Sequence, residues 1–209
     1  RGMSSAASDV YKRQDVYGIK KWGNDILDIL ENGNIGLKNP FHPDNSPADL
    51  IKIIKSLNER GISCPVLLRV TDYLAFRIKQ INNSFFRAIR EIRYKGEYKG
   101  VFPVKVNQQA QVIDRIVEFG KEFDFGLEVG SKPELLIALA HDLSANSTII
   151  CNGIKDREFI HLAILSIKIG FKTILVLESP RELDLIIKIS KELNAVSYTH
   201  LRAHETDYY

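Results

Sequence analysis

Apolar and polar positions follow two different periods along the second half of the chain. Short runs rich in β-branched residues predict strands, and between them apolar residues recur every three or four positions, which predicts helices. The equivalent strand positions Val101, Phe125, Ile149 and Leu175 lie 24, 24 and 26 residues apart. This regular interval predicts four strands, at residues 101–106, 123–128, 148–151 and 172–177.

Signals for the start of a helix follow three of these strands. The segments SKPE at 131–134 and SPRE at 179–182 match the capping box, and Asp156 is predicted to cap the helix between them. Strands that alternate with helices at this interval predict βα units and a parallel sheet, because a parallel crossover needs a connection of helix length.

Such a sheet closes in one of two main ways, as a (β/α)8 barrel of the TIM type or as an open doubly wound sheet. No G-x-G-x-x-G motif follows the first predicted strand, which weakens the dinucleotide-binding version of the open sheet. The predicted fold class is therefore α/β, with about four βα units that would make half of a barrel.

The first part of the chain has a different pattern. Apolar periodicity predicts helices at 49–60 and 72–93 and a strand at 65–69. Within residues 17–39, Asn32-Gly33 is typical of a hairpin turn, so we expect short strands there. The predicted organisation is an amino-terminal segment with strands at 15–64, followed by the first part of the barrel at 65–196.

The two ends, residues 1–14 and 197–209, show no amphipathic pattern. They contain SAASDVYKRQ and VSYTHLRAHET, which resemble translated sequencing-adapter DNA. We therefore expect two unpacked tails and a natural coding sequence that continues past Val196. Ordinary disordered termini are the alternative.

Composition restricts the class of protein. Of the 209 residues, 44% are hydrophobic and 26% charged, which excludes a wholly disordered chain. The net charge of +3 is too small to indicate nucleic acid or an anionic membrane as a partner, and no apolar run approaches the ~20 residues of a transmembrane helix. Two cysteines are too few for a disulfide framework, so we expect a cytoplasmic protein. Cys151, within an apolar strand, is predicted to be a buried hydrophobe, and the histidines do not cluster as zinc ligands would.

Lys105 is the first candidate for chemistry. It ends the apolar run 101–104, and functional groups of parallel α/β sheets gather at the carboxyl ends of strands. A lysine partly desolvated by apolar neighbours loses its proton more easily and can attack a carbonyl group. The alternative is a lysine that extends into solvent from the strand end.

Several motifs around Lys105 carry a family resemblance. FPVKVNQ at 102–108, FGLEVGSKPEL at 125–135 and CNGIKDREFIHLA at 151–163, in this order and spacing, resemble the biosynthetic arginine decarboxylases. YGIKKWGND at 17–25 and INNSFFRAIRE at 81–91 resemble the amino-terminal region of the same family. The resemblance covers residues 15–196.

The resemblance implies a fold, a cofactor and an activity. These enzymes are pyridoxal-phosphate-dependent lyases with a barrel like that of alanine racemase, and the lysine at the position of Lys105 holds the cofactor. The implied reaction converts L-arginine to agmatine and carbon dioxide, at the start of polyamine and spermidine synthesis. Magnesium is implied as an accessory ion and a homo-oligomer as the assembly. Since the family's enzymes are several times longer, we expect this chain alone to be inactive.

Three other residues are candidates for cofactor binding. Glu128 ends the second strand, where it would orient Lys105 or the cofactor, or accept from backbone amides at the next helix. Asn107 either holds the loop after Lys105 or caps the next helix, and we favour the cap. Asn152, after the third strand, has the same two interpretations.

Two other functions fit parts of the sequence. One is a protein of the same barrel type that carries pyridoxal phosphate without catalysis, although such a single-domain carrier would lack the strand-containing segment at 17–39. The other is an open-sheet nucleotide-binding domain, which the missing glycine motif disfavours.

Overall fold

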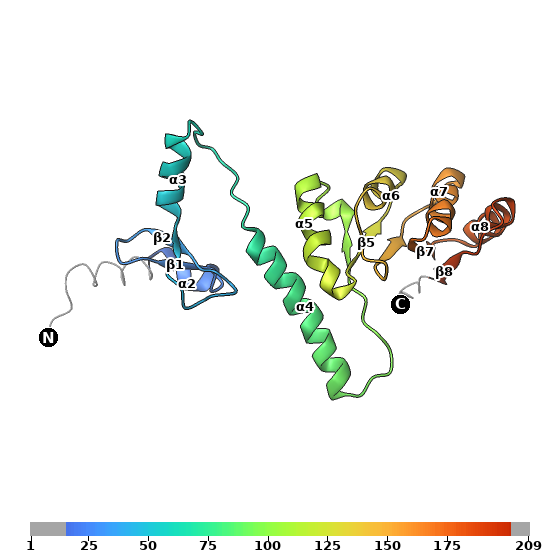
Figure 1. Cartoon of the computed structure of the whole chain (residues 1–209), viewed down its shortest axis with the longest axis horizontal. Coiled ribbons are helices and arrows are strands. Elements are labelled where there is room, and N and C mark those ends of the chain that lie inside the picture. The colour runs from blue at the N-terminus through green and yellow to red at the C-terminus, as the bar shows by residue number, and fades with distance from the viewer. Residues whose placement is uncertain (1–15, 202–209) are drawn as a thin grey trace, which may run out of the picture. The chain divides into compact units, whose positions relative to one another are not determined.

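The computed structural model describes residues 16–201 of the chain. These residues form two compact units that divide between Phe76 and Arg77, inside helix α4 (Thr71–Glu91) (Figure 1). The sequence placed the boundary earlier, at 64/65. The beginning of α4 belongs to the first unit because the Tyr73 hydroxyl donates a 2.5 Å hydrogen bond to the Lys38 carbonyl and the Phe76 ring packs edge-on against Phe41.

The described part of the first unit contains a small antiparallel sheet, two helices and the beginning of α4. The predicted hairpin is confirmed, since Ile29 pairs with Ile35 on either side of the turn that contains Asn32 and Gly33. The predicted helix at 49–60 is also confirmed, as α3. The elements are α2 (Ile19–Trp22), β1 (Leu27–Ile29), β2 (Ile35–Leu37), β3 (Ala48–Asp49) and α3 (Leu50–Glu59), with sheet order β1-β2-β3.

Asp49 joins the hairpin turn to α3. Its carboxylate accepts hydrogen bonds from the side-chain amides of Asn34 and Asn32 and from the backbone amides of Ile51 and Lys52 in the first helical turn. The bond from Asn34 and then that from Asn32 contribute most to lowering the pKa of Asp49 to about 2. The charged carboxylate therefore stabilises the folded unit.

Acid is expected to release this cap. Because the folded pKa is lower than the ordinary value of 3.8, the stabilisation is complete above pH 3.8 and is lost as the pH falls through about 2. Hydrogen-exchange protection of the Ile51 and Lys52 amides should follow this curve, and Asp49→Ala should lower it at neutral pH. Asp44→Ala, at an exposed aspartate nearby, is the control. Protection that Asp49→Ala leaves intact would contradict the assignment.

The second unit contains a five-stranded parallel sheet with order β4-β5-β6-β7-β8. The predicted parallel arrangement of four βα units is confirmed. Its strands are β4 (Val101–Pro103), β5 (Gly126–Val129), β6 (Thr148–Cys151), β7 (Lys172–Leu177) and β8 (Tyr198–Leu201), and its helices after α4 are α5 (Ala110–Gly120), α6 (Lys132–Leu139), α7 (Arg157–Lys168) and α8 (Pro180–Glu192).

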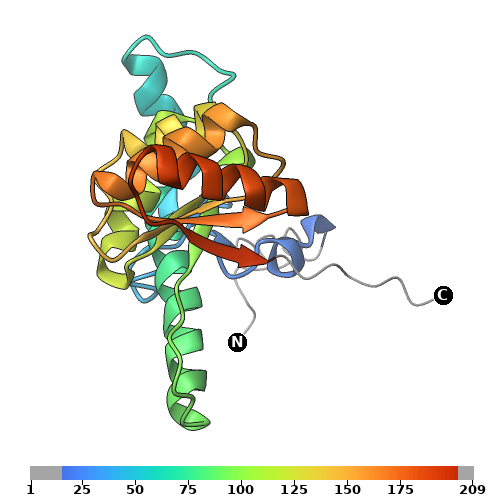
Figure 2. The same cartoon turned by 90° about the vertical axis from the view of Figure 1, so that its right-hand side faces the viewer.

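The helices cover one face of this sheet. Helices α5 to α8 lie side by side in chain order, and a second view shows α8 above β7 and β8 (Figures 1 and 2). Leu127, Ile149 and Leu175 alternate onto this face and are fully buried. The register aligns Glu128 with Ile150 and Ile174, which are only half-buried, on the other face. That second face corresponds to the interior of the expected barrel.

Two expected strand ends and one expected strand are wrong. Residues 104–106 form a short 3-10 helix, η1 (Val104–Val106), because β4 stops pairing at Pro103, opposite Glu128. Lys121–Phe123 forms a second such turn, η2, so that β5 begins only at Gly126. Residues 65–69 form no strand.

The expectation of an unpacked tail from residue 197 onward is wrong for Tyr198–Leu201. These residues form β8, which pairs in parallel with β7 and extends the sheet. Tyr198 and Thr199 are residue types that favour strands, and the edge of β7 is open to pairing with them. The expected tail at 1–14 lies outside the described residues, and so do residues 202–209.

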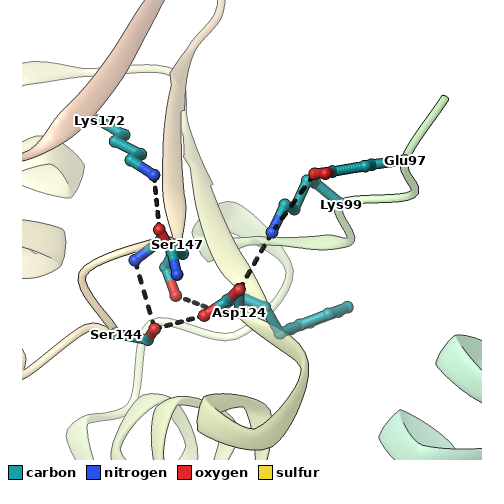
Figure 3. A network of polar contacts seen from close by, with 8 residues as sticks. Glu97, Lys99, Asp124, Ser144, Ser147 and Lys172 are labelled. Atoms are coloured by element: carbon teal, nitrogen blue, oxygen red, sulfur yellow. Dashed lines mark hydrogen bonds and ion pairs between the residues drawn. The ribbon is translucent and has the colours of Figure 1, made fainter.

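The amino ends of the strands are joined by a polar network (Figure 3). Asp124 accepts hydrogen bonds from Lys99, at 3.0 Å, and from the Ser144 hydroxyl, at 2.5 Å. Lys172 donates to the side chain of Asn146, and the Ser147 hydroxyl donates to the Phe125 carbonyl. At the amino edge of the sheet, these polar side chains therefore bind neighbouring loops to one another. The candidate site residues lie at the opposite, carboxyl edge.

Candidate functional site

Lys105 and Glu128 meet at the carboxyl edge of the parallel sheet. Lys105 lies in η1, directly after β4, and Glu128 lies near the end of the adjacent strand β5. The Lys105 Nζ atom is 3.7 Å from Glu128 Oε1. The Lys105 side chain is 65% exposed, whereas that of Glu128 is only 6% exposed. The accessible amine of Lys105 therefore lies beside the buried carboxylate of Glu128, whose position is fixed by its surroundings.

Asn152 supplies part of that fixation. Its side-chain amide donates a 2.9 Å hydrogen bond to Glu128 Oε1, the oxygen that faces Lys105. Its backbone amide donates to the Val129 carbonyl, which ties the loop after β6 to the end of β5. Of the two interpretations for Glu128, the structure shows the contact with Lys105. The carboxylate that binds a backbone amide at the next helix is Glu134 instead.

The environment of Lys105 differs from the expected one. Of the two interpretations of Lys105, desolvation by apolar neighbours is wrong and extension into solvent is seen, because the side chain leaves the sheet from η1 and is largely exposed. Its local electrostatics come from Glu128 rather than from an apolar pocket.

Asn107 holds the loop that follows Lys105. Its side-chain oxygen accepts a hydrogen bond from the Gln109 backbone amide at 3.1 Å. The favoured interpretation, that Asn107 caps the next helix, is wrong, since the N-cap residue of α5 is Gln109. Asn107 therefore acts on the loop between η1 and α5.

Two buried glutamates lie at this edge that the sequence does not identify as site residues. Glu134 and Glu182 are the glutamates of the two capping boxes, and their carboxylates accept from the backbone amides of Gly130 and Glu178, four residues earlier. Glu182 also forms an ion pair with the buried Lys155. The capping-box motif was a visible signal for both glutamates, but the partner of Lys155, 27 residues away, depends on the tertiary fold.

Cys151 is a structural residue, as predicted. It is fully buried, and this burial is the main reason that the pKa of its thiol is raised to about 12. The thiol therefore stays protonated and unreactive at neutral pH.

Metal binding and membrane insertion find no support in the part of the chain that the structure describes. Among residues 16–201, no three His, Cys, Asp or Glu side chains gather in a way that could hold a metal ion. The same residues include no helix with the length and apolar character needed to cross a membrane.

The family is decided by a comparison of the sequence with known protein families. Residues 78–207 match the pyridoxal binding domain of the pyridoxal-dependent decarboxylases. The chain belongs to the pyridoxal-dependent decarboxylase family. The match extends past Val196, so the matched region includes β8, and the adapter origin of the carboxyl end stays a prediction.

Individual members of the family are similar to nearly all of the chain. The biosynthetic arginine decarboxylases of Prochlorococcus marinus strain MIT 9312 and of Gloeobacter violaceus are 45% and 42% identical to it, over 90% and 92% of this chain. The crystal structure of the biosynthetic arginine decarboxylase from Campylobacter jejuni superposes with a TM-score of 0.78 at 34% identity, over 88% of this chain. The resemblance and the barrel-type fold expected from the sequence are thus confirmed.

The chain spans only about 30% of the length of these decarboxylases, 29% and 30% of the two sequences and 30% of the crystallised chain. The family match assigns residues 78–207 to a pyridoxal binding domain rather than to an open-sheet nucleotide-binding domain. The roles of Lys105, Glu128, Asn107 and Asn152 are not tested by these comparisons and remain predictions.

Proposed function

We propose that this chain is the pyridoxal-phosphate-holding part of a decarboxylase that acts on L-arginine, and that Lys105 is the residue that holds the cofactor. The observation that carries the proposal is the arrangement at the carboxyl edge, where the exposed Lys105 amine lies 3.7 Å from a buried carboxylate. The family assignment supplies the cofactor class.

The residues at this edge fit pyridoxal phosphate. Its aldehyde needs an accessible primary amine, and Lys105 presents one. Glu128 lies beside that nitrogen, with its Oε1 atom 3.7 Å from Lys105 Nζ, and Asn152 keeps the carboxylate there by donating to the same oxygen. Asn107 fixes the loop on the other side of Lys105 through Gln109.

These contacts indicate separate roles for the cofactor, Lys105 and Glu128. When bound, pyridoxal phosphate supplies a conjugated ring that accepts the electrons released as the carboxylate leaves. The part of Lys105 is to bind and orient the aldehyde carbon, and the part of Glu128 is to hold the lysine side chain in place. Arginine as substrate, agmatine as product and a role in polyamine synthesis rest on the similarity to biosynthetic arginine decarboxylases.

A hybrid enzyme tests the function. Residues 16–201 would replace the matching stretch of the Campylobacter jejuni decarboxylase, and carbon dioxide release would be measured with arginine, ornithine and lysine as substrates. We expect release from arginine at a rate near that of the parent enzyme. A hybrid that folds and takes up the cofactor, yet releases no carbon dioxide from arginine, would contradict the proposal.

The 209-residue chain alone is expected to release no carbon dioxide from arginine above background. The physical reason is that a bound cofactor and substrate need contacts from several barrel strands, and the relatives devote about 70% of their length to residues that this chain does not match. The assay is carbon dioxide release with added pyridoxal phosphate. Turnover that Lys105→Ala abolishes would overturn this expectation.

Three further expectations from the sequence stay predictions. They are magnesium as an accessory ion, a homo-oligomer as the assembly and a cytoplasmic location.

A further inference from the structure

A buried ion pair lies next to the candidate site and has no part in the function proposed above. The side chain of Lys155 is 0% exposed and that of Glu182 is 6% exposed, with 3.3 Å between Lys155 Nζ and Glu182 Oε2. Lys155 ends the loop after β6, and Glu182 lies in the first turn of α8. A buried ion pair is weak grounds for added stability, because the cost of desolvating both ions offsets their attraction. Its place in the fold is therefore more informative.

The pair clamps the loop of residues 152–155. Lys155 Nζ donates a 2.5 Å hydrogen bond to the Gly153 carbonyl, and the Lys155 backbone amide donates to Glu182 Oε1 at 2.9 Å. The other carboxylate oxygen of Glu182 accepts from the Glu178 amide at 2.8 Å. Glu178 in turn accepts from the Gly153 amide at 3.2 Å. The Gly153 amide is thus bound by Glu178, shortly before α8, and its carbonyl by Lys155, which pairs with Glu182 of α8.

Gly153 allows the loop to take this path. Its φ angle is +73°, in the left-handed region, and a Cβ atom there would lie only 3.2 Å from the Gly130 carbonyl oxygen. The preceding residue is Asn152, which donates to Glu128 on β5. A chain of direct contacts therefore runs from Glu182 through Lys155, Gly153 and Asn152 to the carboxylate beside Lys105.

The charged state of Glu182 suits this role. Burial acts to raise the pKa of its carboxyl group, but the backbone amides of Glu178 and Lys155, together with the Lys155 ammonium group, outweigh burial and lower the pKa. Glu182 is therefore an anion at neutral pH, and it can hold the Lys155 cation and the two amides together.

We propose that Lys155 and Glu182 are positioning residues for the candidate site, which hold the loop 152–155 so that Asn152 keeps the Glu128 carboxylate beside Lys105. The importance of this position for the cofactor rests on the proposed function, whereas the clamp itself does not depend on it. Glu134 has the same location at a helix start and the same bond to a backbone amide, but its side-chain partner is Gln108 rather than a lysine.

The clamp is tested in the 209-residue chain without any cofactor. The chain would be labelled with 13C and 15N and its lysines left unmodified, so that NMR reports the Asn152 side-chain amide and the Lys105 side chain separately. Glu182→Gln is expected to speed hydrogen exchange of the Asn152 side-chain amide by about tenfold, which corresponds to about 1.4 kcal/mol. It should also shift the Lys105 signal in the same direction as Glu128→Gln does.

Glu192→Gln is the matched control. Glu192 also lies on α8 and pairs with Arg157 of α7, but this pair is exposed and touches no residue of the loop 152–155. The control should leave both signals unchanged. If Glu182→Gln leaves them unchanged as well, or if Glu192→Gln moves them equally, the clamp is wrong, whereas the function proposed for Lys105 would stand. Failure of the hybrid enzyme would overturn that function and leave the clamp intact.

A second variant separates positioning from stability. Glu182→Gln leaves the Lys155 charge buried without its partner and can unfold the unit, whereas Lys155→Met together with Glu182→Gln removes both charges. The double variant should recover the urea midpoint of the unsubstituted chain but still show fast exchange at Asn152 and a shifted Lys105 signal, because no amine binds the Gly153 carbonyl. Recovery of all three measurements together would show that the pair has only a structural role.

Discussion

Lys105→Ala is expected to lower carbon dioxide release by the hybrid enzyme by about 10³-fold or more, the scale on which the loss of a covalent catalytic residue acts. The reason is that the proposed function needs an accessible amine to bond to the aldehyde carbon, and Lys105 presents one, whereas the amine of Lys155 is buried in an ion pair. The rate at saturating arginine is the quantity to measure, with the Michaelis constant determined in the same series.

The control for this variant is Lys121→Ala. Lys121 is an exposed lysine in the turn before β5, at the opposite edge of the sheet, where it pairs with Asp142. Its loss should change the rate less than twofold, because an exposed ion pair at the opposite edge of the sheet does not contact the candidate site. Equal losses in the two lysine variants would show that the effect of Lys105→Ala arises from general damage to the fold.

Ile160→Ala is expected to lower the free energy of unfolding of the second unit by about 2–5 kcal/mol. Ile160 lies on the face of α7 that packs on the sheet and is fully buried, so truncation removes apolar contacts and leaves a cavity. Urea unfolding of the chain, followed by far-UV circular dichroism, measures the change. An Ile160→Ala variant with the same free energy of unfolding as the unsubstituted chain would mean that α7 does not pack as described.

Ile169→Ala is the comparison for that prediction. Ile169 follows the last turn of the same helix, and its side chain is exposed. The same truncation should therefore change stability by no more than about 0.5 kcal/mol. The atoms removed are identical, so burial accounts for most of the expected difference between the two isoleucines.

Local patterns predicted the elements of the second unit better than their ends. The alternation of strands and helices followed from the positions of apolar residues and from capping residues such as Ser131 and Asp156, whose caps the structure contains. The path at Val104–Val106 could not be predicted in the same way, since valines favour a strand, but pairing with β5 stops at Pro103. Where a strand ends is decided by its neighbour and not by its own sequence.

The site was predictable to the extent that it follows strand ends. Lys105, Glu128 and Asn152 each lie at or just after the carboxyl end of a predicted strand, and a parallel sheet brings such residues to one edge. The contact between Lys155 and Glu182 could not be predicted, because it joins a loop to a helix that is two elements away. The strand β8 was not predicted, because its segment resembles adapter sequence and Tyr198 and Thr199 are too few to indicate a strand without the pairing with β7.

The central claim is that Lys105 holds pyridoxal phosphate, and mapping the attachment point tests it most directly. The hybrid enzyme would be loaded with the cofactor, reduced with borohydride to make the link permanent, digested and analysed by mass spectrometry. The account predicts that the pyridoxyl mass lies on Lys105 and that Lys105→Ala removes it. A pyridoxyl group found on another lysine, in the same yield with and without Lys105, would contradict the account.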